Sequence, residues 1–124
     1  MKGVVFTPDE KMYVRDFGLP LRETVGEAVG GWIEIVHPHG LEAPYCMIVN
    51  EEGLLEALRL NPLGCVLYQS MTHGFPIVGN IVVMKEGYVD GELDIVDLTE
   101  EEIAEIKEMA MTISGGSIEE VETE

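Results

Sequence analysis

The apolar residues of this chain fall into short runs that glycine and proline separate, and this pattern sets the strongest limit on its fold. The 124 residues include 14 Gly and 6 Pro. Runs of about four to eight β-branched or aromatic residues between turn residues predict strands. Such strands are predicted at residues 3–7, 12–17, 32–36, 45–49 and 77–84, with an alternating edge strand at 92–95.

One long helix is predicted near the C-terminus. Thr99 and Glu102 have the spacing of a capping box, which marks a helix start. The following residues repeat apolar side chains at helical spacing and predict a helix over residues 100–113. This apolar stripe consists of Ile103, Ile106, Ala110 and Ile113.

Two shorter segments also have helical features. Residues 21–29 predict a short helix that Gly30 ends. Leucines at 54, 55 and 58 predict a helix of one or two turns, and Asn61–Pro62 is interpreted as the end of that helix. Residues 65–68 fit either a buried strand or part of a helix, and both alternatives stay open.

Glycines indicate two further features around the predicted strand at 77–84. Gly79 lies inside that strand, where it indicates a bulge or a close backbone approach. The segment Lys85–Gly87 is expected to begin a turn region that continues to Gly91.

The order of these elements predicts an α+β domain. Regular strand–helix–strand alternation is missing, so we expect a mostly antiparallel or mixed sheet of about five to six strands with two to three helices packed on it. The length fits one domain, assigned to residues 1–114. Residues 115–124 are expected to form an acidic, flexible tail.

The charge of the chain is strongly acidic and unevenly distributed. It has 24 acidic and 7 basic residues, for a net charge of −17. Residues 86–124 contain 14 of the acids and a single base, Lys107. Direct nucleic-acid binding needs clustered Lys and Arg and is therefore not expected, whereas a basic protein partner is. A homodimer, if formed, should join through the less charged residues 1–85.

The sequence predicts neither a membrane segment nor a signal peptide. No apolar stretch approaches the ~20 residues that cross a bilayer, and the first ten residues become acidic before a long apolar region develops. We therefore expect a cytoplasmic protein. Its two cysteines, Cys46 and Cys65, are interpreted as buried thiols of a reducing compartment.

Four segments and one helix start together resemble the domain-of-unknown-function 3846 family. The resemblance covers roughly residues 3–113 and implies a small accessory protein of bacteria, phages and mobile elements, without an activity that can be transferred. The sequence departs from the family pattern in the acidic tail after Gly116 and in residues 67–76. The segments that carry the resemblance are Val29–Val36, Ile48–Gly53, Leu60–Gly64, Val78–Val83 and Leu98–Ile103.

Catalytic and metal-binding motifs are not recognised. His37, His39 and His73 could join the cysteines around a metal, but their spacing matches no familiar site. A cysteine with His73 could form a thiolate–imidazole pair, yet Cys46 lies in an apolar strand where thiols are usually inert. Nucleophile elbows and phosphate-binding glycine loops are also missing. We therefore predict no catalytic residue, metal or cofactor, and an enzyme is the third alternative.

A polar loop is the first candidate binding site. Function concentrates in loops on a rigid scaffold, so this loop could bind a ligand or partner. The alternative, which we favour, is structural, because Asn and Gly supply turn conformations. The residues of this loop are Asn50, Glu51, Glu52, Gly53, Arg59 and Asn61.

The second candidate is an acidic partner face on the predicted C-terminal helix. Glu101, Glu105 and Glu108 would repeat negative charge about every 5 Å along its exposed side, given ~1.5 Å of rise per residue. Such a face could occupy the basic groove of a nucleic-acid-handling protein by mimicry. The alternative is that these charges only solvate the helix.

Two classes of function remain. The first is a non-catalytic accessory protein that acts through a protein partner, with nucleic-acid mimicry as its most concrete form. The second is a protein that binds or sequesters a small nucleotide-type ligand. The second class requires a cavity beside cations that could contact phosphates. The cations considered for this role are Lys2, Lys11, Arg15, Arg22 and Arg59.

Overall fold

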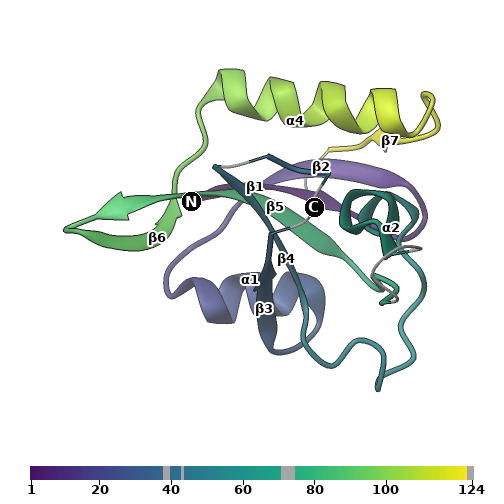
Figure 1. The fold of residues 1–124 in the computed structure, drawn as a ribbon, viewed down its shortest axis with the longest axis horizontal. Coiled ribbons are helices and arrows are strands. Elements are labelled where there is room, and N and C mark those ends of the chain that lie inside the picture. Colours follow the sequence, from purple (N-terminus) through teal and green to yellow (C-terminus); the bar gives the residue numbers. More distant parts are fainter. Residues whose placement is uncertain (38–39, 43, 71–74, 123–124) are drawn as a thin grey trace.

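A computed structural model describes residues 1–37, 40–42, 44–70 and 75–122 of the protein. These residues form a seven-stranded mixed sheet and three helices, which confirms the predicted α+β class (Figure 1). The strands are β1 (Lys2–Phe6), β2 (Lys11–Asp16), β3 (Ile33–Val36), β4 (Tyr45–Asn50), β5 (Ile81–Val89), β6 (Glu92–Val96) and β7 (Glu119–Glu120). The helices are α1 (Leu21–Val29), α2 (Pro62–Tyr68) and α4 (Glu100–Ile113).

The sheet runs in the order β3-β4-β5-β1-β2-β7, and β6 pairs with β5 outside this path. The β2–β7 pair is parallel and the other pairs are antiparallel. Helix α4 covers one face of the sheet, together with α2 at one side, and α1 covers the opposite face (Figure 1). Because side chains alternate between the faces of a strand, the sheet has a separate apolar core on each face.

Strand β5 begins later and extends further than the sequence predicts. It starts at Ile81, and the expected turn from Lys85 is wrong, because pairing with β4 and β6 keeps Lys85 to Val89 extended. The turn consists of Asp90 and Gly91, whose φ values of 52° and 81° suit a two-residue hairpin. Gly79 precedes the strand instead of lying inside it, and the group packed against it is a side chain: its φ is +75°, and a Cβ there would lie 2.8 Å from Leu58 Cδ1.

The leucine-rich segment after β4 does not form the predicted helix. Residues 51–57 form successive turns instead, and Leu54 and Leu55 remain exposed rather than packing as a helical stripe. Residues 65–68 are helical, within α2. The interpretation of Asn61–Pro62 as a helix end is therefore wrong, because Asn61 is the N-cap of α2 and Pro62 occupies its first turn.

Helices α1 and α4 have the predicted bounds. Gly30 ends α1 with a φ of 88°, a left-handed conformation that glycine adopts without steric penalty. In α4, Ile103, Ile106 and Ala110 are buried against the sheet, whereas Ile113 is 37% exposed. None of the helices in the described ranges is both long and apolar enough to cross a membrane.

The predicted capping box of α4 is present. Thr99 Oγ1 accepts a hydrogen bond from the Glu102 backbone N–H at 3.2 Å, and Glu102 Oε1 accepts one from the Thr99 backbone N–H at 2.9 Å. We expect Thr99→Ala to lower the free energy of unfolding by about 1 kcal/mol, because a cap hydrogen bond is lost. Urea unfolding checks this value, and an unchanged midpoint would contradict it.

Part of the predicted flexible tail belongs to the sheet. Strand β7 pairs with Lys11 and Met12 of β2, and Ile118 is only 4% exposed. Lys11 Nζ also lies 2.7 Å from Glu119 Oε2. The acidic composition of this segment predicts a flexible tail, but its side chain Ile118 packs into the core beneath α4.

Candidate functional site

Asn50, the first residue of the candidate loop, has a structural role. Its side chain donates hydrogen bonds to the Val29 carbonyl at 3.2 Å and to Glu56 Oε1 at 3.0 Å. Its Oδ1 accepts a hydrogen bond from the Glu52 backbone N–H at 2.8 Å. This buried amide therefore ties the turn segment to the end of α1.

Asn61 is fully buried and joins three parts of the chain. Its Nδ2 donates to the carbonyls of Phe6 at 3.0 Å and Gly79 at 2.8 Å, and its Oδ1 accepts from the Gly64 backbone N–H at 3.0 Å. All of these are backbone groups of the core. This arrangement leaves the Asn61 side chain with no access to a ligand.

The other loop residues do not converge on one site. A Cβ at Gly53 would lie 2.7 Å from Val78 Cγ2, so close packing requires glycine there. Glu52 and Arg59 are exposed, and neither lines the nearest cavity. Only Glu51 joins Asn50 in the lining of that cavity.

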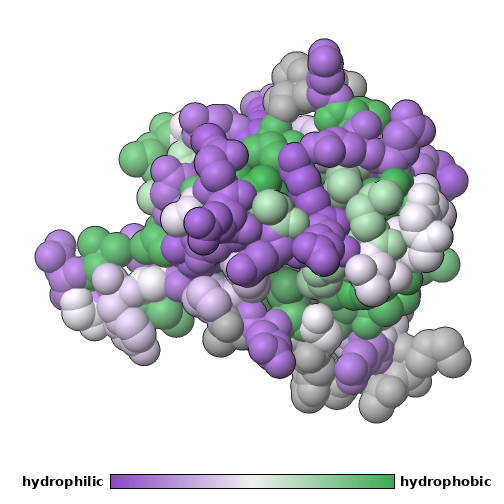
Figure 2. Space-filling view, turned by 90° about the horizontal axis from the view of Figure 1, so that it is seen from above, coloured by the Kyte–Doolittle hydropathy of each residue, from purple (hydrophilic) through white to green (hydrophobic). Residues whose placement is uncertain are grey.

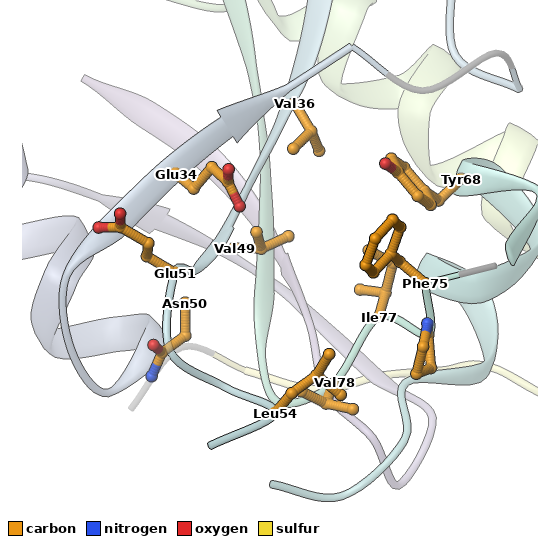
Figure 3. A pocket seen from close by; sticks show the side chains of 11 residues that line it. Glu34, Val36, Val49, Asn50, Glu51, Leu54, Tyr68, Phe75, Ile77 and Val78 are labelled. Atoms are coloured by element: carbon orange, nitrogen blue, oxygen red, sulfur yellow. The ribbon is translucent and has the colours of Figure 1, made fainter. Parts of the chain in front are cut away.

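That cavity has a volume of about 340 Å³ and lies between β3, β4, α2 and the segment before β5 (Figure 3). Its carboxylate residue Glu34 and its aromatic residues Tyr68 and Phe75 were not singled out by the sequence. They come from three segments that are distant along the chain, so no local spacing could reveal them. The full lining is Glu34, Val36, Val49, Asn50, Glu51, Leu54, Tyr68, Phe75, Pro76, Ile77 and Val78.

The acidic face of α4 has the exposure that the sequence predicts. Glu101, Glu105 and Glu108 are all exposed, and none forms an ion pair within the described residues. Figure 2, seen from the α4 side, shows many hydrophilic residues across the middle of this face, with hydrophobic residues between and beside them.

The neighbouring acids of α4 are neutralised by lysines. Lys2 Nζ lies 2.9 Å from Glu100 Oε1, and Lys85 Nζ lies 2.8 Å from Glu102 Oε1. The hydrogen bonds from these lysines hold the pKa of both carboxyls below its ordinary value. Two of the three carboxylates in the first turn of α4, those of Glu100 and Glu102, are therefore compensated by lysines. The uncompensated carboxylates lie on the outer face of the helix.

Tyr45 connects this face to the sheet. Its hydroxyl donates a hydrogen bond to Glu105 Oε2 at 2.9 Å. Burial, together with this carboxylate, raises the pKa of Tyr45 to about 12, so the hydroxyl stays protonated and keeps donating at neutral pH. Glu105 is thus held in place while it remains exposed.

Two shallow cavities lie beside Glu105. One, of about 320 Å³, is lined by Glu105, Glu108, Met109, Thr112 and Ile113. The other, of about 280 Å³, is lined by Gly40, Leu41, Glu42, Tyr45, Glu105, Ile106 and Met109. The acidic face therefore combines negative charge with hollows that have apolar walls.

The cysteines differ in their surroundings. Cys46 is fully buried in β4, and burial raises the pKa of its thiol from 9.0 to about 12. Cys65 is half-buried in α2, and its thiol contacts the backbone of Ile77 at 3.4 Å. A protonated, inaccessible thiol is a poor nucleophile.

We expect Cys46 to resist alkylation by iodoacetamide at about pH 8 until the protein unfolds, whereas Cys65 should react in the folded state. The raised pKa of the Cys46 thiol also means that unfolding releases a proton above pH 9.0. The free energy of unfolding should therefore fall as the pH rises toward about 12. Mass spectrometry of the labelled peptides checks the first expectation. Rapid labelling of Cys46 in the folded protein would contradict it.

The histidines give no metal site in the part of the chain that the structure describes. His37 contacts the carboxylate of Glu86. His39 and His73 lie outside the described residues. Among the described residues, no group of three or more His, Cys, Asp or Glu side chains is arranged to hold a metal ion.

Comparison with known proteins gives a family but no activity. A model of the family described as "Domain of unknown function (DUF3846)" matches residues 1–111, which include β1 to β6, α1, α2 and most of α4. Neither a curated protein nor a solved structure matches the chain. Because the match spans nearly the whole chain, this protein belongs to the domain of unknown function 3846 family.

Proposed function

We propose that this protein is a non-catalytic accessory protein that binds a basic protein partner through the outer face of α4. The observation that carries the proposal is the set of three exposed carboxylates, Glu101, Glu105 and Glu108, which have no cationic partner among the described residues. Their neighbours Glu100 and Glu102 do have such partners.

The distribution of cations supports this proposal. Most of the seven basic residues already form ion pairs with the protein's own carboxylates, so few are left to neutralise α4. The exposed field of a protein with a net charge of −17 then attracts basic surfaces and increases their association rates. The paired cations are Lys2, Lys11, Arg15, Lys85 and Lys107.

The hollows beside Glu105 favour a protein partner over a purely solvating role. Met109 contributes to the walls of both hollows, and Ile113, which is 37% exposed, contributes to one. Protein interfaces combine apolar contacts at their centre with a polar rim. A partner that presents Lys or Arg together with apolar side chains would match this face.

Nucleic-acid mimicry is the most concrete form of this proposal. The three glutamates repeat charge about every 5 Å along α4, from ~1.5 Å of rise per residue. Duplex DNA carries about one charge per 1.7 Å of axis. The face is therefore less dense in charge than DNA, and we propose that it occupies part of a basic groove in a nucleic-acid-handling protein. We also propose that the protein acts in the cytoplasm as an accessory protein of a mobile element, which is the setting that the family resemblance implies.

The test uses a triple variant, Glu101→Gln, Glu105→Gln and Glu108→Gln, in affinity capture from host lysate at low and moderate salt. We expect a basic protein to be retained by the wild type, to elute with salt, and to bind the triple variant at least tenfold more weakly. This expectation follows from three lost charge contacts of about 0.5–1 kcal/mol each.

The matched control is the triple variant Glu23→Gln, Asp90→Asn and Glu92→Gln. These three residues are exposed and form no ion pair within the described ranges, so the control loses the same net charge away from the α4 face. The control should retain the partner. Equal losses in both variants would assign the binding to net charge alone and contradict a role for this face.

No observation favours the nucleotide-type ligand as a second proposal. The four cavities described for this protein are lined by no Lys or Arg. The five cations that were considered as phosphate contacts therefore do not line these cavities. They are Lys2, Lys11, Arg15, Arg22 and Arg59. A phosphate placed there would meet carboxylates instead.

A further inference from the structure

The cavity beside β3 is separate from the α4 face and has its own chemistry. Its floor consists of aliphatic side chains, which include Val49 and Ile77 (Figure 3). Tyr68 and Phe75 form the wall opposite Glu34 and Glu51. Its volume of about 340 Å³ suits a small ligand or a single long side chain.

Two apolar side chains at this cavity are uncovered. Phe75 is 63% exposed and Leu54 is 54% exposed. Single exposed apolar residues are ordinary, but here both line the same concave surface. A ligand with an apolar portion would remove this surface from water.

The charged groups that line the cavity are Glu34 and Glu51, both negative. The Glu34 carboxylate is directed toward Val49 and the middle of the hollow, whereas the Glu51 carboxylate points away from it (Figure 3). Neither carboxylate forms an ion pair within the described ranges of the chain. An anionic ligand would be repelled at this position, and a cationic one would be attracted.

We propose that this cavity binds an amphipathic organic cation, namely a protonated amine or guanidinium on an aliphatic stem. The stem lies on Val49 and Ile77, and the cationic group contacts the Glu34 carboxylate. The ring of Phe75 covers the ligand from the other side, where its π-face can also attract the cation. Long basic side chains combine an apolar stem with a charged head in this way.

Two sources could supply this chemistry. One is a free polyamine, and the other is a Lys or Arg side chain that a protein presents. Both would use the same contacts, so the probes must distinguish them. The site lies between β3, β4, α2 and the segment before β5, so its occupancy does not depend on the function proposed for α4.

The experiment titrates the isotopically labelled full chain with three probes and follows backbone amide signals by NMR. The probes are spermidine, a blocked pentapeptide with one central lysine, and an uncharged alkane diol of similar length. We expect at least one cationic probe to shift the signals of Val49, Ile77 and Val78 in a saturable way, and the diol to bind at least fivefold more weakly. Saturation by spermidine alone identifies a free amine as the ligand, and saturation by the peptide identifies a protein side chain.

Variants distinguish binding of a cation in this cavity from nonspecific attraction of cations to an acidic protein. Glu34→Gln should weaken binding about fivefold, because one charge contact with the ligand is lost. Phe75→Ala should weaken it by a similar factor through lost apolar and cation–π contacts. Glu92→Gln removes the same charge from an exposed residue of the β5–β6 hairpin that lines none of the described cavities, and it should leave the titration unchanged. Absence of saturable shifts with both cationic probes, equal binding of the diol, or equal effects of Glu34→Gln and Glu92→Gln would overturn the proposal.

Discussion

Replacement of Asn61 by alanine is expected to lower the free energy of unfolding by about 3–4 kcal/mol. The fully buried amide satisfies the carbonyls of Phe6 and Gly79 and the backbone N–H of Gly64. Alanine would remove the hydrogen bonds to these three core groups and would also remove the N-cap of α2. Small domains are stable by about 5–15 kcal/mol, so the variant should unfold at a much lower urea concentration.

The control for this prediction is Thr99→Ala, which removes a cap at a site exposed to solvent. Water can replace the lost hydrogen bond there, so the expected loss is about 1 kcal/mol. A loss at Asn61 no larger than at Thr99 would show that the buried hydrogen bonds contribute little. The two urea midpoints, measured under the same conditions, decide between these outcomes.

Replacement of Ile106 by alanine is expected to lower the free energy of unfolding by about 3 kcal/mol. Ile106 is 1% exposed and packs α4 onto the sheet in a cluster with Phe6, Met47 and Ile81. The truncated side chain would leave a cavity under the helix that carries the acidic face. Calorimetric unfolding measures the effect, with a clearly lower midpoint temperature expected.

The matched control is Ile113→Ala in the last turn of the same helix. Ile113 is 37% exposed, so its truncation removes little buried surface and should lower the free energy of unfolding by less than about 1 kcal/mol. Equal effects at both positions would mean that α4 does not dock as the structure shows.

Local signals in the sequence were sufficient for α4 but not for the segment after β4. The capping box and apolar stripe of α4 lie within one helix, so neighbouring residues alone determine its bounds. Leu54, Leu55 and Leu58 also have helical spacing, yet the chain turns there. Asn61 makes the difference, because its hydrogen bonds to Phe6 and Gly79 place it at the start of α2, and these partners are not local.

Strand pairing explains the other differences. Residues 85–89 contain a glycine and charged side chains and resemble a turn in isolation. In the structure they are held extended by β6, and in part by β4. Likewise, β7 forms because β2 offers a free edge and Ile118 reaches the core. These pairing strands are separate segments of the chain, so the local sequence of residues 85–89 or of β7 does not indicate them.

The two candidate sites differ in the same way. The acidic face could be predicted, because exposure of Glu101, Glu105 and Glu108 follows from the periodicity of one helix. The cavity beside β3 could not, because Glu34, Tyr68 and Phe75 come from separate segments. In the polar loop, two residues that attracted attention, Asn50 and Asn61, form hydrogen bonds within the fold.

The most direct test of the central claim is zero-length carbodiimide cross-linking of this protein to the captured basic partner. The reagent joins carboxylates to amines in contact, and mass spectrometry then identifies the linked residues. The proposed interface predicts cross-links from Glu101, Glu105 or Glu108 to lysines of the partner, which should disappear at high salt. Cross-links that arise only from carboxylates away from α4, such as Glu23 or Glu92, would contradict the assignment of this face as the binding surface.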